Sequence, residues 1–152
     1  MDGLILFDST MINDNFKNGK IKRCGLIKYY RHGDFYYKLN VGKHIRYYKN
    51  GTKTTTVYDD WGTSLTNTYH DSEGNLISQS ITTLVETTAS NLDEFLTSGK
   101  HITFKTYFED FAYDRKSCEY YLKKTGQSDN GKREGLWKYY YPSGELKKEK
   151  NY

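Results

Sequence analysis

Turn-forming glycines set among aromatic and β-branched segments constrain this chain more than any other feature. The clearest unit lies near the C-terminus, where Gly135-Leu136-Trp137-Lys138-Tyr139-Tyr140 precedes Pro142-Ser143-Gly144 and then an alternating segment. Glycine accepts positive φ at no steric cost, whereas Tyr, Thr, Ile, Val and Trp suit a pleated, half-buried surface. The pattern therefore predicts a β-hairpin whose two strands meet at the glycine turn.

Weaker copies of this unit occur earlier in the chain. Residues 25–30 repeat its Gly-Leu-x-Lys-Tyr-Tyr core, and a degenerate copy surrounds Gly74. A third copy runs from Gly42 to Gly51, which are nine residues apart (51 − 42 = 9), as are Gly135 and Gly144 (144 − 135 = 9). These copies predict a repeat protein built of stacked hairpins.

The spacing of the turn glycines predicts five or six units of about 23 residues. Gly51 and Gly74 are 23 residues apart (74 − 51 = 23). Gly99 falls near the next expected turn, and residues 114–117 (Asp-Arg-Lys-Ser) are interpreted as a turn in which glycine has been replaced. The repeat signal is weakest over residues 85–125, where we expect degenerate units within one domain spanning residues 1–152.

Tyrosine supplies much of the apolar content, with 16 of the 152 residues. Adjacent tyrosines occur at 29–30, 36–37, 47–48, 120–121 and 139–141. Neighbouring side chains of a strand point to opposite faces, so each pair places a ring on both sides of a sheet. Most of these rings are expected to stack along the sheet, and the alternative is an exposed aromatic recognition strip.

One segment departs from the strand pattern. Asn91 is a capping residue, Asp93 and Glu94 follow in the first turn, and Gly99 ends the segment. These are helix start and stop signals, and they predict at most one short helix near 91–97. At the N-terminus the only strand signal is Leu4–Phe7, which is also the longest apolar run and far shorter than the ~20 residues of a membrane span.

Charge is unevenly distributed, with +6 over residues 1–50, −5 over 51–100 and +3 over 101–152, which sum to +4. This profile differs from the uniformly basic surface of a typical nucleic-acid binder and favours a protein partner with a mixed surface. No basic segment followed by an apolar stretch opens the chain, so we expect a cytoplasmic protein. Cys24 and Cys118 are expected to be reduced structural thiols.

The sequence contains no arrangement typical of catalysis or of cofactor binding. Its four histidines are not spaced as metal ligands, and phosphate-loop and dinucleotide motifs are absent. The acidic pairs 59–60 and 109–110 would diverge in a strand or turn, which disfavours a catalytic carboxylate pair. We therefore expect no enzyme, no cofactor and no metal.

Residues 131–149, with their echoes after Gly25 and Gly42, resemble the variant class of MORN (membrane occupation and recognition nexus) repeats. They are especially similar to bacterial antitoxins built from such repeats. The match is good over the last 20 or so residues and covers about a third of the chain. The resemblance implies antiparallel hairpins stacked into an elongated, twisted meander sheet, with a binding role and no catalytic residues.

Together these observations predict an all-β protein that binds a protein partner, as an antitoxin or immunity protein that neutralises a toxin by direct contact. Trp, Tyr and Arg dominate the hot spots of protein interfaces. The candidate binding residues are Trp137, Tyr139, Tyr141, Arg46 and Tyr48. The alternative is a single-stranded nucleic-acid binder that uses the strips of Lys or Arg beside Tyr at 28–31, 46–49 and 138–140.

Overall fold

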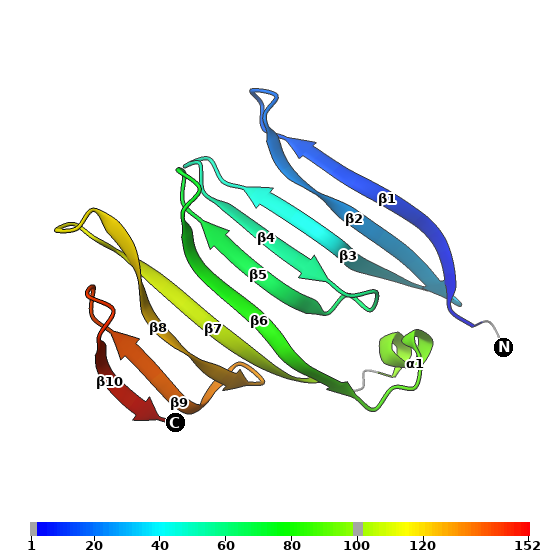
Figure 1. Ribbon diagram of the computed structural model, residues 1–152. Helices are drawn as coiled ribbons and strands as arrows, with labels where there is room; N and C mark the ends of the chain where they lie inside the picture. Colours follow the sequence, from blue (N-terminus) through cyan, green and yellow to red (C-terminus); the bar gives the residue numbers. More distant parts are fainter. Residues whose placement is uncertain (1–2, 99–101) are drawn as a thin grey trace.

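A computed structural model describes residues 3–98 and 102–152 and shows a single ten-stranded antiparallel sheet. The strands lie side by side in chain order, so the sheet is a meander in which every neighbouring pair except β6–β7 is joined by a short turn. Figure 1 shows this sheet as one open, twisted layer with β1 and β10 at its two edges. The predicted all-β meander with one short helix is confirmed. The strands are β1 Ile5–Asn15, β2 Ile21–His32, β3 Phe35–Tyr47, β4 Lys53–Tyr58, β5 Ser64–His70, β6 Leu76–Thr87, β7 Ile102–Asp114, β8 Glu119–Asp129, β9 Lys132–Tyr140 and β10 Leu146–Asn151.

Five of the turns have the same hydrogen-bonded geometry. In the turn after β3, Tyr48 N–H donates to the Thr52 carbonyl (2.9 Å) and Gly51 N–H donates to the Tyr48 carbonyl (3.0 Å). This geometry places the fourth residue at positive φ, which glycine adopts without strain. The residues at this position are Gly19, Gly51, Gly62, Gly74 and Gly144. The turns expected at Gly51, Gly74 and Gly144 are therefore confirmed.

The turns that follow the odd-numbered strands β1, β3, β5, β7 and β9 all lie at one end of the sheet, which we call the hairpin end (Figure 1). The turn expected at residues 114–117 is present there, because β7 ends at Asp114 and β8 begins at Glu119. Cys118, with φ of 57°, takes the glycine position. The turn expected at Gly99 lies outside the described residues.

The repeat is less regular than the sequence suggested, and one of its copies was misaligned. Gly135 and Gly42 both have positive φ (64° and 66°) at bulges in β9 and β3. Gly25 is an extended residue of β2 opposite the bulge at Gly42, and its structural counterpart is Gly126 of β8 rather than Gly135. The turn glycines at the hairpin end are 32 residues apart from Gly19 to Gly51 (51 − 19 = 32) and 23 from Gly51 to Gly74, so no fixed unit of 23 residues exists.

The sheet is also more continuous than expected. β1 extends from Ile5 to Asn15, well beyond the predicted strand at Leu4–Phe7. Two long strands, β7 and β8, occupy the region in which the repeat signal fades, with 13 and 11 residues. The antiparallel pairing therefore continues where the sequence motif is lost. Strand pairing depends on backbone hydrogen bonds and on the alternation of side chains between the two faces, and it does not require the Gly-Leu-Trp motif.

Helix α1, Leu92–Thr97, is the helix predicted near 91–97. The Asn91 side chain caps it by accepting a hydrogen bond from Glu94 N–H (2.9 Å). Phe95 packs against Trp61, with ring centroids 5.4 Å apart, and Asp93 hydrogen bonds to His32 (2.8 Å). The connection between β6 and β7 is thus held near the β2–β3 and β4–β5 turns.

The hydrophobic core is thin, as expected of a single layer. Only three hydrophobic residues of the described part are buried, namely Ile27, Val41 and Trp137. Ile27 and Val41 belong to the β2–β3 pair, and Trp137 belongs to β9. Burial is therefore concentrated in two places, one in each half of the sheet.

Candidate binding surfaces

On one face of the sheet, a row of cross-strand neighbours runs from β3 to β8. At each end of this row, an aromatic ring packs over a glycine of the adjacent strand. We call this face the ring face. His44 covers Gly25, where an added Cβ would lie 2.3 Å from the imidazole, and Trp137 covers Gly126, where it would lie 2.2 Å from the indole. The pairs that join the two sites run His44–Thr56, Thr56–Asn67, Asn67–Ser80, Ser80–Phe108 and Phe108–Gly126.

Each seated ring also hydrogen bonds to the residue after its glycine. His44 Nε2 lies 2.8 Å from the Leu26 carbonyl, and Trp137 Nε1 donates to the Gln127 carbonyl (2.9 Å). Trp137 is only 4% exposed and stacks on Phe108. The prediction that Trp137 contacts a partner is therefore wrong, because the indole is part of the core and its one polar atom is satisfied.

The predicted residue Tyr139 belongs to a cluster of rings and cations beside Trp137. Arg133 lies over both the Trp137 ring (4.7 Å) and the Tyr152 ring (5.1 Å), and its Nη1 donates to the Tyr152 hydroxyl (2.6 Å). The hydroxyls of Tyr139 and Tyr152 are 3.2 Å apart. Lys148 and Lys150 lie over these two rings, at 4.9 and 4.3 Å from their centroids.

This cluster perturbs the acidity of its two phenols in opposite directions. The hydrogen bond with Tyr139, aided by Arg133 and Lys150, lowers the pKa of Tyr152 to about 8. The same hydrogen bond raises the pKa of Tyr139. Tyr152 is therefore the phenol of the pair that ionises first, and its phenolate accepts the hydrogen bond of the Tyr139 hydroxyl.

The other predicted residues lie apart from this cluster. Tyr141 is 44% exposed and has Lys147 over its ring at 5.3 Å. Arg46 lies over the Tyr48 ring at 5.6 Å, and Tyr48 is 39% exposed. From β3 to β9 is six strand steps, or roughly 29 Å at ~4.8 Å per step. The five predicted residues therefore lie in separate groups, one at the end of β3 and one at β9 and the turn after it.

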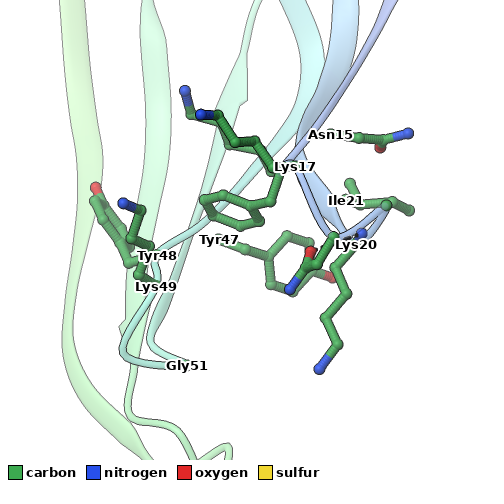
Figure 2. A pocket seen from close by; sticks show the side chains of 12 residues that line it. Asn15, Lys17, Lys20, Ile21, Tyr47, Tyr48, Lys49 and Gly51 are labelled. Carbon is green, nitrogen blue, oxygen red and sulfur yellow. Dashed lines mark hydrogen bonds between the residues drawn. The ribbon is translucent and has the colours of Figure 1, made fainter.

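Tyr48 also lines a cleft at the hairpin end, which sequence reasoning did not find. The hairpin-end cleft, of about 930 Å³, separates the turn after β1 from the turn after β3. Figure 2 shows Tyr48 and Lys49 on one side and Lys20 and Ile21 on the other. The cleft exists because the β2–β3 ladder stops at Arg23–Arg46 while the β1–β2 ladder continues to Asn15–Ile21, so the two hairpin ends separate. Its lining residues are 15–22, 47–49 and 51.

The next turns along this end are in contact. A Cβ on Gly51 would lie 2.8 Å from Ser72 Cβ, which shows how closely the turns after β3 and β5 approach. Asp71 of the second of these turns accepts a hydrogen bond from the Tyr120 hydroxyl (2.6 Å). This bond holds the pKa of Asp71 well below its ordinary value and raises the pKa of Tyr120 to about 12.

The two edges of the sheet differ sharply. β1 contains no lysine or arginine, and four of its apolar side chains are at least half exposed. These are Ile5, Leu6, Phe7 and Met11. β10 carries three lysines in six residues. Lysines on an edge strand oppose pairing with another strand, so β10 is better protected than β1, whose charged residues are Asp8 and Asp14.

The part of the chain that the structure describes contains neither a metal-binding group nor a membrane-spanning helix. In residues 3–98 and 102–152, no three His, Cys, Asp or Glu side chains are grouped so as to hold a metal ion. No helix in the same part of the chain is long and apolar enough to cross a membrane. Comparisons with protein-family models, curated proteins and solved structures found no match to this chain.

Proposed function

We propose that the protein binds a protein partner by adding an extended segment of that partner to the free edge of β1. The observation that carries the proposal is the exposure of β1, an 11-residue edge strand whose apolar side chains face solvent. An exposed edge offers a row of unpaired N–H and C=O groups, and a partner strand gains hydrogen bonds by completing the ladder.

An apolar corner beside this edge would give such a partner side-chain anchors. Phe7 contacts Tyr29 and Tyr36, with ring centroids 6.1 and 5.6 Å apart. Phe35 and Tyr36, at the β2–β3 turn, are 70% and 67% exposed. Large rings held by neighbours and open to solvent are the residues that contribute most binding energy at interfaces.

In its more specific form, the proposal is that the protein acts in the cytoplasm as an antitoxin or immunity protein. The resemblance of residues 131–149 to repeats found in bacterial antitoxins supports this form. Such a protein neutralises its toxin by occupying the toxin surface, so the role requires binding and no reaction. The β1 edge is the surface we assign to that contact.

The test compares lysine substitutions at the two edges. Leu6→Lys combined with Met11→Lys places two charges on β1, while Leu146→Lys places one on β10, where lysines already occur. Wild-type protein and the β10 variant should capture the same protein from the native host, whereas the β1 variant should lose it. Co-expression of the captured protein with the antitoxin candidate should restore growth only when β1 is intact.

Two outcomes would contradict the proposal. Capture that is equal for the β1 and β10 variants would show that β1 is not the contact. Light scattering that finds a stable dimer, converted to monomer by the β1 substitutions, would show that the edge is occupied by a second copy instead of a different protein.

A further inference from the structure

The hairpin-end cleft gathers four lysines around one space. It is lined by Lys17, Lys20, Lys22 and Lys49 and by no acidic residue. None of these lysines forms an ion pair with another described residue. Some basic side chains elsewhere are paired, such as Lys105 with Glu134 (3.1 Å) and Lys124 with Asp110 (2.9 Å). The cleft therefore concentrates a positive potential that nothing described in the chain compensates.

Tyr48 joins this cleft to a second hollow, of about 480 Å³, on the ring face of β2, β3 and β4. Arg46, Arg23 and Lys38 line the second hollow. The two hollows thus share Tyr48 and form one surface that runs from the hairpin end along β2 and β3.

Cations and rings alternate along this surface. Arg46 lies over Tyr48 at 5.6 Å and Lys38 over Tyr29 at 5.9 Å. Tyr36, two residues before Lys38 on the same face of the strand, is 67% exposed. β2 has 12 residues, so at ~3.3 Å per residue the surface is about 40 Å long.

The acidic residues of β1 flank one side of this surface, and Asp34 lies at its far end in the β2–β3 turn. Asp14 pairs with Arg23, and Asp8 accepts hydrogen bonds from Ser9 N–H (2.7 Å) and the Thr10 hydroxyl (2.9 Å). On the other side, β4 and β5 contain no acidic residue. The basic surface is therefore bounded on one side by the partnered carboxylates of β1 and on the other by strands without acidic residues.

We propose that the hairpin-end cleft and the ring face of β2–β3 together bind a single strand of nucleic acid. Lysine and arginine would neutralise phosphates, and Tyr48, Tyr29 and Tyr36 would provide platforms on which bases stack. A surface on which cations alternate with aromatic rings is complementary to a nucleic acid strand, in which each unit has a charged phosphate and a flat base. An acidic peptide repeats its charge without a flat ring at each step. This site shares Tyr29 and Tyr36 with the apolar corner beside the β1 edge, but its hairpin-end cleft lies apart from that corner, and the proposal does not depend on the proposed protein partner.

The experiment measures binding of a fluorescent oligothymidylate to the full chain by anisotropy over a range of salt concentrations. The cleft variant combines Lys17→Gln, Lys20→Gln and Lys49→Gln. The control variant combines Lys116→Gln, Lys123→Gln and Lys132→Gln, which removes the same charge from exposed positions outside the two hollows. For a single-stranded nucleic acid, the slope of log K against log salt concentration becomes shallower by about 0.7 for each phosphate contact that is removed. The cleft variant should therefore reduce the slope by about 2, and the control variant should leave it nearly unchanged.

Stacking is tested separately at Tyr48. Tyr48→Ala should weaken binding about ten-fold without changing the salt slope, because it removes a ring and no charge. Tyr48→Phe keeps the ring and should bind like the wild type, which excludes misfolding as the cause. Absence of binding at low salt would overturn the proposal, as would equal losses in the cleft and control variants. Displacement of the oligonucleotide by an equal concentration of polyglutamate would assign the surface to acidic protein segments instead.

Discussion

At the scale of single residues, the most demanding positions are the glycines beneath the two seated rings. Gly25 and Gly126 have ordinary backbone angles, so conformational freedom does not explain them. They are required because His44 and Trp137 lie where a Cβ would be. The glycine and the ring must therefore be considered as one packing unit, with the ring N–H fixed by the next carbonyl.

This unit predicts the effect of Gly126→Ala. The added methyl would meet the Trp137 ring at 2.2 Å, so the indole must move and lose its hydrogen bond to Gln127. We expect a loss of about 2–3 kcal/mol in the free energy of unfolding, measured by urea denaturation. Gly3→Ala, at a position with nothing within 4 Å, is the matched control and should be nearly neutral.

The pairing can be confirmed with a double-mutant cycle. Once Trp137→Ala has removed the indole, Gly126→Ala should cost much less than it does in the wild type. Strictly additive losses would show that the glycine and the tryptophan are independent.

The Tyr139–Tyr152 pair predicts a tyrosine that titrates early. The pKa of Tyr152 is lowered to about 8 from an ordinary value of 10, so its phenolate is favoured in the folded protein. For an acid with a depressed pKa, the stabilising contribution grows as pH rises from about 8 toward 10 and is absent below that window. Ultraviolet absorbance during a pH titration should show one phenolate forming near pH 8.

The controls for this titration are two Tyr→Phe variants. Tyr139→Phe removes the main cause of the shift and should return the pKa of Tyr152 toward 10. Tyr141→Phe, outside the hydrogen-bonded pair, should leave the early titration in place. An early titration that survives Tyr139→Phe would refute the assignment.

At the scale of elements, the turns determine how the hairpins fold, and one of them departs from the rule. Seven turns place a glycine at positive φ, whereas the turn between β7 and β8 places Cys118 there with φ of 57°. A non-glycine residue in this region is strained. Asp114 partly offsets the strain by accepting hydrogen bonds from the Ser117 N–H (3.0 Å) and hydroxyl (2.9 Å).

Replacing this residue by glycine should stabilise the protein. Cys118→Gly removes the strain of the left-handed conformation, although it also makes the unfolded chain more flexible. We expect the free energy of unfolding, measured by urea denaturation, to rise by about 0.5–1 kcal/mol. Cys118→Ala removes the thiol and keeps the strain, so it should give no such gain. If both variants stabilise the protein equally, the thiol and not the backbone angle is responsible.

At the scale of the whole molecule, each strand packs mainly against its neighbours in sequence. Strand order equals chain order, and the extensive contacts between elements are all between consecutive strands. Stability in such an array is approximately a sum of local terms. The two places where hydrophobic residues are buried, at β2–β3 and at β9, should therefore be able to unfold separately.

The two tryptophans can report on the two halves. In Trp61→Phe the remaining fluorescence comes from Trp137, and in Trp137→Phe it comes from Trp61. Trp137 lies next to β10, whose residues are all exposed, so its signal should change at lower urea than that of Trp61. Coincident transitions in the two variants would instead indicate a single cooperative unit.

The sequence was most informative about local structure. Glycine turns, alternating tyrosines and one set of helix caps predicted an antiparallel meander with a helix near 91–97, because these features act over a few residues. Sequence reasoning aligned Gly25 with Gly135 instead of Gly126. The sequence does not distinguish an extended glycine that lies under a ring from a glycine at a bulge. It also placed Trp137 on the surface, because the seat beneath its ring is supplied by Gly126 on another strand.

The binding surfaces were less accessible to sequence reasoning for the same reason. The lysines of the hairpin-end cleft lie in two turns about 30 residues apart (49 − 20 = 29), and only the separation of two hairpin ends brings them around one space. Exposure of the apolar residues of β1 likewise depends on β1 being an edge strand.

The sequence by itself therefore determined the hairpin as the unit, since backbone angles and side-chain alternation are local properties. The tertiary structure decided which rings are buried, which strand is left unpaired and where charge gathers, because each of these depends on which strands become neighbours.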